Sequence, residues 1–322
     1  MTSESISVDL RKFRILREVS LVADGKTMFA FALSEAFEVK NGTLNVKGES
    51  VLHRKDGLIG MSGAYFDPSL LSASSVDEVL DAWKWIGEKV GVSFHQMSAW
   101  LTGVFVLRAI LEGPINFAVA TPIEVAVKLY KLSRSIDTST KIHELKQAIR
   151  GNVKSWTQDK TVRWYKNVEQ MVGFLSNLSS EFDFALFSLE CGLPIKLARR
   201  PDMYILEIPV DVKSLSWDTS LDPPKYARKI IDRATKTFQR QHAEMAGLSI
   251  GIALVMLGLV KQRTSRIGRK GFCAALKNGL VLARDRRKPV LLFYHDPWTG
   301  DVQARTETLE NLGKYFSRGI GF

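Results

Sequence analysis

The spacing of apolar and polar positions predicts that this chain begins with a β-rich segment. Thr43 to Val51 alternates apolar and polar residues, as a half-buried strand does. Val19 to Val22 and Met28 to Leu33 are apolar segments on either side of the turn Ala23-Asp24-Gly25-Lys26. We therefore expect strands to dominate residues 5–53.

After Ser75 the apolar positions follow the period of an α-helix. Ser75 precedes two acidic residues, which favours a helix start at this point. Val79, Ala82, Trp83 and Ile86 then share one helical face. Further helical segments are predicted over residues 93–112, 122–132 and 138–149. Gly151-Asn152 ends the last of them, so we place a domain boundary near residue 150.

Helical and strand-like segments alternate in the second half of the chain. The pattern predicts helices over residues 158–178, 222–245 and 271–282, and strands over 181–189, 194–198, 203–214, 248–260 and 289–294. We therefore expect a mixed α/β (α+β) protein with two domains. Residues 1–150 are a β-rich segment followed by helices, and residues 151–322 are a mixed sheet flanked by helices.

The strand predicted over Tyr204 to Ser214 ends in Asp211-Val212-Lys213. Residues two apart in a strand point to the same face, so Asp211 and Lys213 are expected side by side, with Val212 facing a core. A carboxylate can hold a hard divalent cation, and a lysine beside it can position or activate a water near a phosphate. This pair is therefore typical of a metal-dependent nuclease.

Asp183, Asp211-Val212-Lys213 and the helix expected from Lys225 resemble the PD-(D/E)xK nuclease superfamily over about residues 158–260. That family has a mixed sheet flanked by helices, with an acidic residue on one strand and a (D/E)-x-K triplet on the next. The resemblance implies that Asp183 and Asp211 bind Mg²⁺ and that Lys213 is the catalytic lysine. It implies hydrolysis of phosphodiester bonds in DNA or RNA.

Two further acids are candidates at the same site. The resemblance makes Glu169 an extra catalytic carboxylate on the preceding helix, and Glu190 a competing metal ligand. The chain departs from the family pattern because Phe182, and not proline, precedes Asp183. Pro209 indicates that the strand lies at an edge or is bulged, since proline has no N–H to donate. The alternative for Asp211 and Lys213 is a surface ion pair on such an edge strand.

The charge of the chain points to a polyanionic partner. The net charge is +11, which favours a polyanionic partner. Nucleic acid is the favoured partner, and an anionic membrane surface is the less favoured one. Residues 261–288 contain ten lysines or arginines against one acid. The predicted nucleic-acid contacts are the cations on one face of the helix over 222–245 and those of the following basic segment: Lys229, Arg233, Lys236, Arg240, Arg266, Arg269 and Lys270.

Two other functions stay open beside the nuclease. The basic segments alone would suit a noncatalytic nucleic-acid-binding or packaging protein. The apolar run from Ala246 to Val260 would suit a membrane anchor, but it is shorter than the roughly 20 residues of a spanning helix. We therefore expect this run to be a buried strand.

The remaining signals narrow the choice of compartment and chemistry. Cys191 and Cys273 are too few for a disulfide framework or a zinc site, and they suit a reducing compartment. Met1 to Arg17 contains no apolar segment of a secretory signal, so we expect an intracellular, cytoplasmic protein. The sequence contains no phosphate-binding loop, no dinucleotide-binding glycine motif and no nucleophile elbow.

Overall fold

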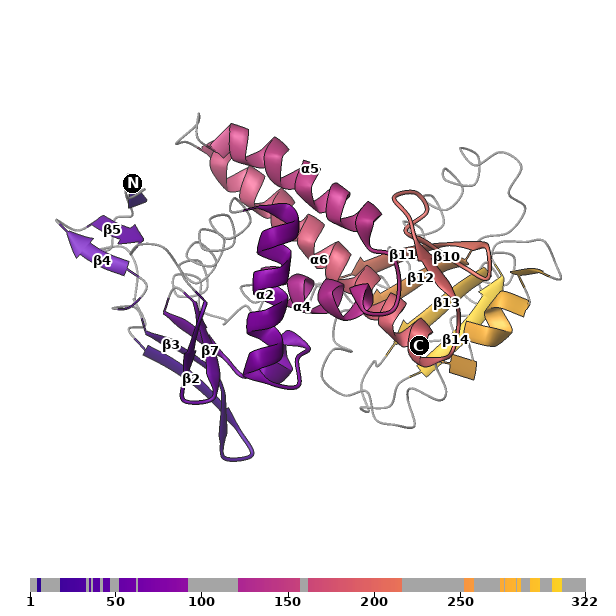
Figure 1. The fold of residues 1–322 in the computed structure, drawn as a ribbon, viewed down its shortest axis with the longest axis horizontal. Coiled ribbons are helices and arrows are strands. Elements are labelled where there is room, and N and C mark those ends of the chain that lie inside the picture. Colours follow the sequence, from indigo (N-terminus) through magenta and orange to yellow (C-terminus); the bar gives the residue numbers. More distant parts are fainter. Residues whose placement is uncertain are drawn as a thin grey trace, which may run out of the picture. The chain divides into compact units, whose positions relative to one another are not determined.

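A computed structural model describes the following residues: 5–6, 18–32, 35, 37–40, 43–46, 52–61, 63–91, 121–156, 162–215, 252–257, 273–274, 276–281, 283–284, 290–295 and 303–308 (Figure 1). The chain divides into two compact units. The first contains Met1–Arg134 and Ile142–Ser179, and the second contains Ser135–Lys141 and Ser180–Phe322. The boundary predicted near residue 150 stays a prediction. Helices and antiparallel strand pairs occur together, which confirms the mixed α/β class.

The first unit begins with antiparallel sheets, as the β-rich pattern predicts. Five strands have the order β2-β3-β8-β7-β6 and three have the order β1-β5-β4. Their bounds are β1 Ser5–Ile6, β2 Glu18–Ala23, β3 Lys26–Ala32, β4 Phe37–Lys40, β5 Thr43–Val46, β6 His53–Lys55, β7 Leu58–Met61 and β8 Ala64–Phe66. Asp24-Gly25 and Asp56-Gly57 have positive φ at both positions, as the tight turns of two-residue hairpins require.

The helices of the first unit begin where the capping residues predict. Ser75 caps α2 (Val76–Val90), since its hydroxyl accepts a hydrogen bond from the backbone N–H of Glu78 at 3.2 Å. The Glu78 carboxylate accepts in return from the backbone N–H of Ser74 at 2.7 Å. The face containing Val79 and Ile86 is buried, as predicted. The other helices are η2 Pro68–Leu71, α4 Thr121–Ser133, α5 Ser139–Trp156 and α6 Val162–Glu190.

A buried ion pair joins α4 to α6 in the core of the first unit. Lys128 is fully buried, and its ammonium donates to Glu124 Oε1 at 2.7 Å and to Ser179 Oγ at 2.9 Å. Glu124 is itself only 5% exposed. A charge that has left water costs several kcal/mol unless it is paired and hydrogen-bonded. This contact therefore fixes the position of one helix against the other.

The second unit contains a mixed six-stranded sheet in the order β14-β13-β12-β11-β10-β9 (Figure 1). Its strands are β9 Ile195–Leu197, β10 Met203–Ile205, β11 Ile208–Leu215, β12 Ile252–Leu257, β13 Val290–His295 and β14 Gln303–Thr308. The pairs β11–β12 and β12–β13 are parallel and the other pairs are antiparallel. The predicted mixed sheet is therefore confirmed, although β14 was not predicted. Helical residues between 273 and 284 agree with the helix predicted there.

The apolar run from residue 246 to 260 contributes β12 to this sheet. β12 pairs with β11 on one side and β13 on the other, so residues 252–257 are a central strand and not a membrane helix. Among the described residues, no helix combines the length and the apolar character needed to cross a membrane. The helices predicted over 93–112 and 222–245 lie outside the described residues.

The strand predicted over residues 181–189 is wrong, because α6 continues to Glu190. Glu181-Phe182-Asp183-Phe184 alternates polar and apolar residues, which imitates a strand over this short window. The buried positions follow helical spacing instead: Met171, Leu175, Leu178, Phe182 and Ala185. A long helix that buries a continuous stripe outweighs a local alternation.

The single strand predicted over 203–214 is a hairpin. Leu206 and Glu207 have φ values of 50° and 64° and connect β10 to β11 as a two-residue turn. Leucine and glutamate rarely adopt positive φ, so the sequence contains no turn signal here. β11 is not an edge strand, because it pairs with β10 on one side and β12 on the other. Pro209 lies opposite Tyr204 of β10 without a shift of register.

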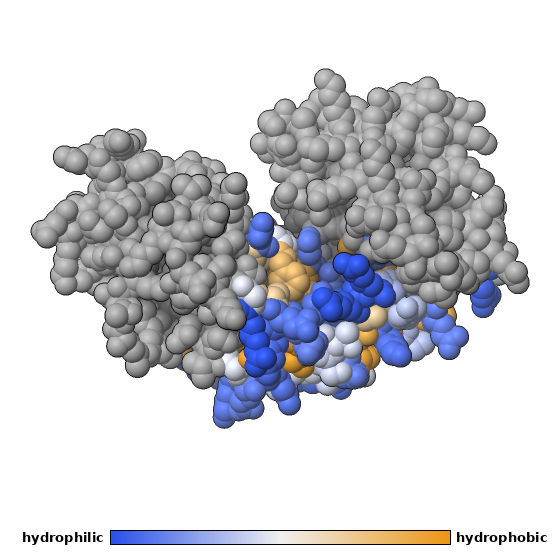
Figure 2. All heavy atoms as spheres, turned by 90° about the horizontal axis from the view of Figure 1, so that it is seen from above, coloured by the Kyte–Doolittle hydropathy of each residue, from blue (hydrophilic) through white to orange (hydrophobic). Residues whose placement is uncertain are grey.

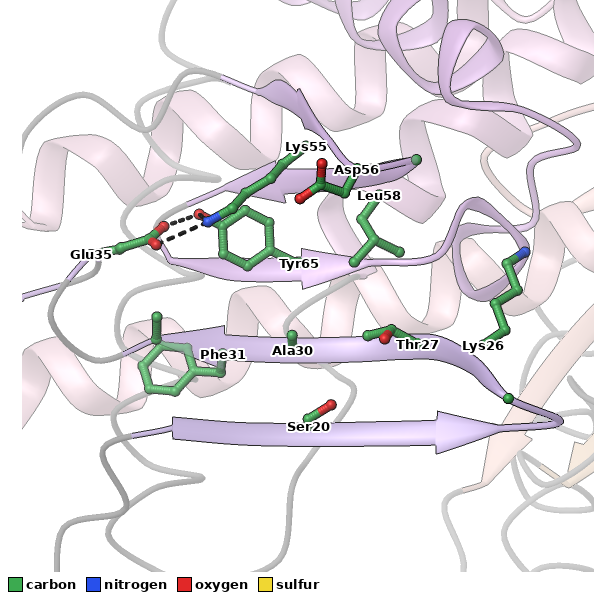
Figure 3. Close-up of a pocket in the computed structure, with 13 residues that line it drawn as sticks. Ser20, Lys26, Thr27, Ala30, Phe31, Glu35, Lys55, Asp56, Leu58 and Tyr65 are labelled. Atoms are coloured by element: carbon green, nitrogen blue, oxygen red, sulfur yellow. Dashed lines mark hydrogen bonds and ion pairs between the residues drawn. The ribbon is translucent and has the colours of Figure 1, made fainter.

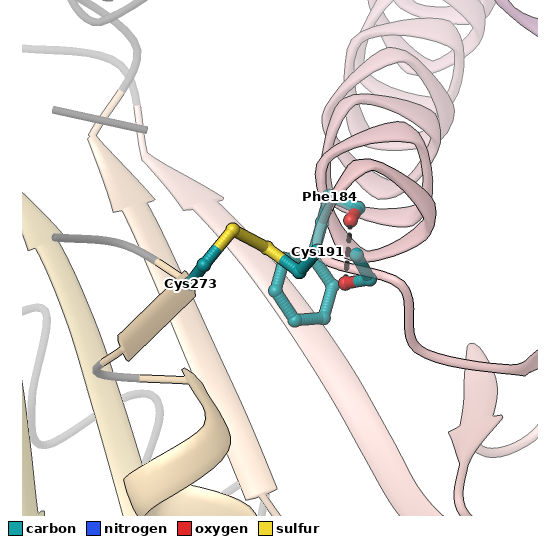
Figure 4. Close-up of a disulfide and its surroundings, with 4 residues drawn as sticks. Phe184, Cys191 and Cys273 are labelled. Carbon is teal, nitrogen blue, oxygen red and sulfur yellow. Dashed lines mark hydrogen bonds between the residues drawn. A yellow bond between two sulfur atoms is a disulfide. The ribbon is translucent and has the colours of Figure 1, made fainter. Parts of the chain in front are cut away.

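The two cysteines form a disulfide, contrary to the expectation of reduced thiols (Figure 4). Cys191 directly follows α6, and Cys273 begins the helical residues before β13. Their Cα atoms are 5.3 Å apart, inside the normal range for a disulfide. The bond spans 82 residues of sequence, which include β9, β10, β11 and β12. The sequence contains no other cysteine with which either could pair.

The disulfide makes the stability of the second unit sensitive to reduction. Closing a loop of 82 residues removes chain entropy from the unfolded state worth about 4.5 kcal/mol. We expect Cys191→Ser/Cys273→Ser to lower the free energy of unfolding by up to that amount in denaturant titrations. Reductant should lower the stability of the natural chain to that of the double variant and leave the variant unchanged. Equal stability of the natural chain with and without reductant would contradict the bond.

The buried ion pair makes a second prediction about stability. Lys128→Met removes the cation beside the buried Glu124 carboxylate, so we expect the free energy of unfolding to fall by about 3–5 kcal/mol. Glu124→Gln/Lys128→Met should recover part of this loss, because the uncompensated charge is gone. Lys84 is exposed on α2, and Lys84→Met should change stability by less than about 0.5 kcal/mol. The measurement is the free energy of unfolding of the natural chain and the three variants in denaturant titrations. A double variant that is no more stable than Lys128→Met would contradict the buried ion pair.

Candidate functional site

Two aspartates lie opposite each other on the β10–β11 hairpin. Met203 pairs with Val210 in the antiparallel register, so Asp202, one residue before β10, lies opposite Asp211 of β11. The Asp202 carboxylate also reaches the backbone of Val212, the residue after Asp211. The hairpin therefore brings the two aspartates close together.

A hydrogen bond fixes the first aspartate to the strand of the second. Asp202 Oδ2 accepts from the backbone N–H of Val212 at 2.7 Å. Asp202 is half-buried and Asp211 is only 4% exposed. The turn before Asp202 is also closed, since the backbone N–H of Ala198 donates to the Asp202 carbonyl at 3.0 Å. The backbone of both residues is thus held in place.

The opposite face of the hairpin is apolar and buried. Met203, Ile205, Val210 and Val212 are at most 5% exposed, as expected for residues that face a core. Asp211 lies on an inner strand and on the other face. This position does not match the alternative of a surface ion pair on an edge strand.

Lys213 follows Asp211 by two residues on β11. Its backbone pairs with Val255 of β12, while that of Asp211 pairs with Ala253. The strand is regular over these pairs, so Lys213 has the same parity along β11 as Asp211. The structure confirms the strand on which the sequence places both residues.

The other acids predicted for this site all belong to α6. Asp183, expected on a strand, is a half-buried helical residue, and Glu190 is the last residue of the helix. Glu169 lies on the same helix, as predicted. Among the described residues, no three or more His, Cys, Asp or Glu side chains gather closely enough to hold a metal ion. The predicted nucleic-acid contacts from Lys229 to Lys270 lie outside the described residues.

Asp202 was missed by the sequence analysis, although a signal was present. Pro201-Asp202 supplies the proline-aspartate dipeptide that Phe182-Asp183 lacks, and it lies close before Asp211-Val212-Lys213. The signal was overlooked because residues 203–214 read as one strand. Without the turn at Leu206-Glu207, Asp202 and Asp211 appear to lie at opposite ends of the same strand.

The carboxylate pair suits a small, hard cation. Magnesium prefers oxygen ligands and keeps several of its waters, so one or two protein carboxylates are sufficient. Asp202, one residue before β10, and Asp211 on β11 are oxygen donors of this kind. Their chemistry agrees with Mg²⁺ better than with zinc, which prefers cysteine and histidine.

The first unit contains a separate, open pocket of about 770 Å³ on its five-stranded sheet (Figure 3). Glu35, Lys55 and Tyr65 form a polar cluster at one end of it. The Tyr65 hydroxyl donates to Glu35, and Lys55 Nζ lies 3.0 Å from the Glu35 carboxylate and 3.2 Å from the hydroxyl. The ammonium also lies 4.4 Å from the centre of the Tyr65 ring, within reach of a cation–π contact.

Both lysines of this pocket are neutralised by carboxylates. Lys55 pairs with Glu35, and Lys26 pairs with Asp67. Burial raises the pKa of Asp67, but hydrogen bonds from Lys26 and Ser69 outweigh burial and hold that pKa below its ordinary value. An anionic ligand would have to break these pairs. The pocket is therefore a weaker candidate for phosphate chemistry than the β10–β11 hairpin.

The described surface in Figure 2 is mainly hydrophilic, with smaller hydrophobic areas between the polar groups.

The chain matches no protein-family model, no curated protein and no solved structure.

Proposed function

We propose that the protein is a metal-dependent nuclease whose site is the β10–β11 hairpin. The observation that carries this proposal is that the hairpin brings Asp202 to β11 beside Asp211, with Lys213 two residues further along that strand. Pro201-Asp202 followed by Asp211-Val212-Lys213 agrees with the PD-(D/E)xK pattern better than Asp183 does. The mixed sheet that contains the hairpin also agrees with that superfamily.

Each residue has a role that follows from its chemistry. Asp202 and Asp211 would hold Mg²⁺ through their carboxylate oxygens. When bound, the ion would lower the pKa of a coordinated water and neutralise the charge that develops on the phosphate. Lys213 would position or activate the attacking water. The water oxygen forms a bond to phosphorus and the water loses a proton, while the bond to the leaving sugar oxygen breaks and that oxygen gains a proton.

The buried position of Asp211 supports its role. Asp211 is only 4% exposed, and the hydrogen bond from the backbone N–H of Val212 orients the Asp202 carboxylate near it. Carboxylate oxygens that are held in fixed positions suit a hard cation such as Mg²⁺.

Isosteric substitutions test the site. They also distinguish Asp202 from Asp183 as the first aspartate of the PD-(D/E)xK pattern. Asp202→Asn keeps an oxygen that can accept from Val212 but removes the charge. We expect Asp202→Asn, Asp211→Asn and Lys213→Met each to lower the cleavage rate at least about 100-fold. Asp183→Asn should stay within about threefold of the natural chain. The measurement is cleavage of labelled single- and double-stranded DNA and RNA with Mg²⁺ or Mn²⁺, and with EDTA.

The outcomes distinguish the alternatives. Loss of cleavage in Asp183→Asn, with cleavage retained in Asp202→Asn, would assign the site to α6. Salt-sensitive binding without cleavage by the natural chain, under any of the metal conditions, would support the noncatalytic nucleic-acid-binding protein. A similar basal rate in every variant would show that the hairpin is not the site.

A further inference from the structure

Three exposed cations lie next to the carboxylate pair. Lys196 is on β9, and Arg199 and Arg200 are in the turn that connects β9 to β10. None of the three forms an ion pair or a hydrogen bond through its side chain with another residue of the described chain. They differ in this respect from Lys26 and Lys55 of the first unit, which are paired with carboxylates.

The fold holds these cations close to Asp202. Arg199 and Arg200 precede it by three and two residues, so their backbones lie within roughly 10 Å of it even in a fully extended chain. The hydrogen bond from Ala198 N–H to the Asp202 carbonyl shortens that separation. Lys196 pairs with Tyr204, which is two residues from Asp202 and therefore on the same face. The backbones of all three residues are thus held near Asp202.

The charges also have a direction along the hairpin. Arg199 and Arg200 lie at the end that contains Asp202 and Asp211. The acidic Glu207 is exposed in the turn at the other end. The arginines therefore attract a polyanion at the carboxylate end of the hairpin, while Glu207 repels it at the turn end.

We propose that Lys196, Arg199 and Arg200 form the phosphate-binding surface that brings the nucleic-acid backbone to the Asp202–Asp211 pair. A phosphodiester that approaches two carboxylates is repelled, and unpaired cations beside them offset this repulsion before and during binding. Arginine suits the role because its planar guanidinium can donate two parallel hydrogen bonds to one phosphate. This inference depends on the proposed function for its purpose, but it can be measured by binding alone.

The apolar residues of the turn favour nucleic acid over a membrane. Binding at a lipid surface usually combines basic residues with apolar side chains that enter the bilayer. Leu197, Pro201 and Met203 are all buried, so the turn exposes charge without an apolar group to insert. A charged surface without such a group is typical of contacts with phosphate backbones.

Removal of the two arginines tests the surface directly. Arg199→Gln/Arg200→Gln should weaken binding of a fluorescent oligonucleotide at least about tenfold, and should lower the slope of log affinity against log salt by about 1 for each cation. Binding is measured in EDTA, so that cleavage does not interfere. Lys84→Gln/Lys89→Gln is the matched control, because it removes two exposed cations from α2. The control should bind within about twofold of the natural chain.

The results separate this inference from the proposed nuclease. If the natural chain cleaves and the arginine variant binds like the control, the surface is wrong and the nuclease stands. If the arginine variant loses binding and the natural chain never cleaves, the surface stands and the nuclease fails. If the natural chain cleaves and the arginine variant loses binding, this variant should have a higher KM for cleavage than the natural chain, with kcat nearly unchanged. If the arginine variant no longer binds vesicles that contain anionic lipid but still binds the oligonucleotide, the assignment of this surface to nucleic acid is wrong.

Discussion

The register of the β10–β11 hairpin is the constraint on which the proposed site depends. A shift of one residue would move Asp211 to the apolar face and Val210 to the polar face. The two-residue turn at Leu206-Glu207 prevents this shift because it fixes which residues are opposite each other. The hydrogen bond from Val212 to Asp202 closes the other end of the hairpin. Both ends thus specify the same pairing, and Asp202 lies close to Asp211 as a consequence.

The disulfide acts on this hairpin through the chain that it closes. Its loop contains β9, β10 and β11, so the covalent link reduces the freedom of the whole site in the unfolded state. Cys191 directly follows a helix whose length the sequence pattern underestimates, and Cys273 is far along the chain. Disulfides persist in oxidising surroundings and are rare where thiols are kept reduced. The bond therefore does not agree with the reduced thiols that two scattered cysteines first suggest.

The parts of the fold that the sequence predicts well are those with long periodic patterns. α2 is one example, because Ser75 and the buried stripe through Ile86 agree on its start and its face. The errors occur where local and global signals conflict. Phe182 and Phe184 alternate with acids inside a helix, and Leu206-Glu207 turns without glycine, asparagine or proline. The sequence pattern does not single out Asp202 for this second reason. Asp202 and Asp211 are nine residues apart in the sequence, and only the turn at Leu206-Glu207 brings them close together.

Whether a cation is paired with a carboxylate indicates where a polyanion can bind, and the net charge does not indicate this. A net charge of +11 attracts polyanions from a distance but does not say where they bind. Lys55 and Lys26 are neutralised by neighbouring carboxylates, and Lys128 is buried beside Glu124. Arg199 and Arg200 are exposed, and they precede Asp202 by three and two residues. A site that must admit both a metal ion and a phosphate requires charges of both signs close together. We propose that the β9–β10 turn supplies the positive charges and that Asp202 and Asp211 supply the negative ones.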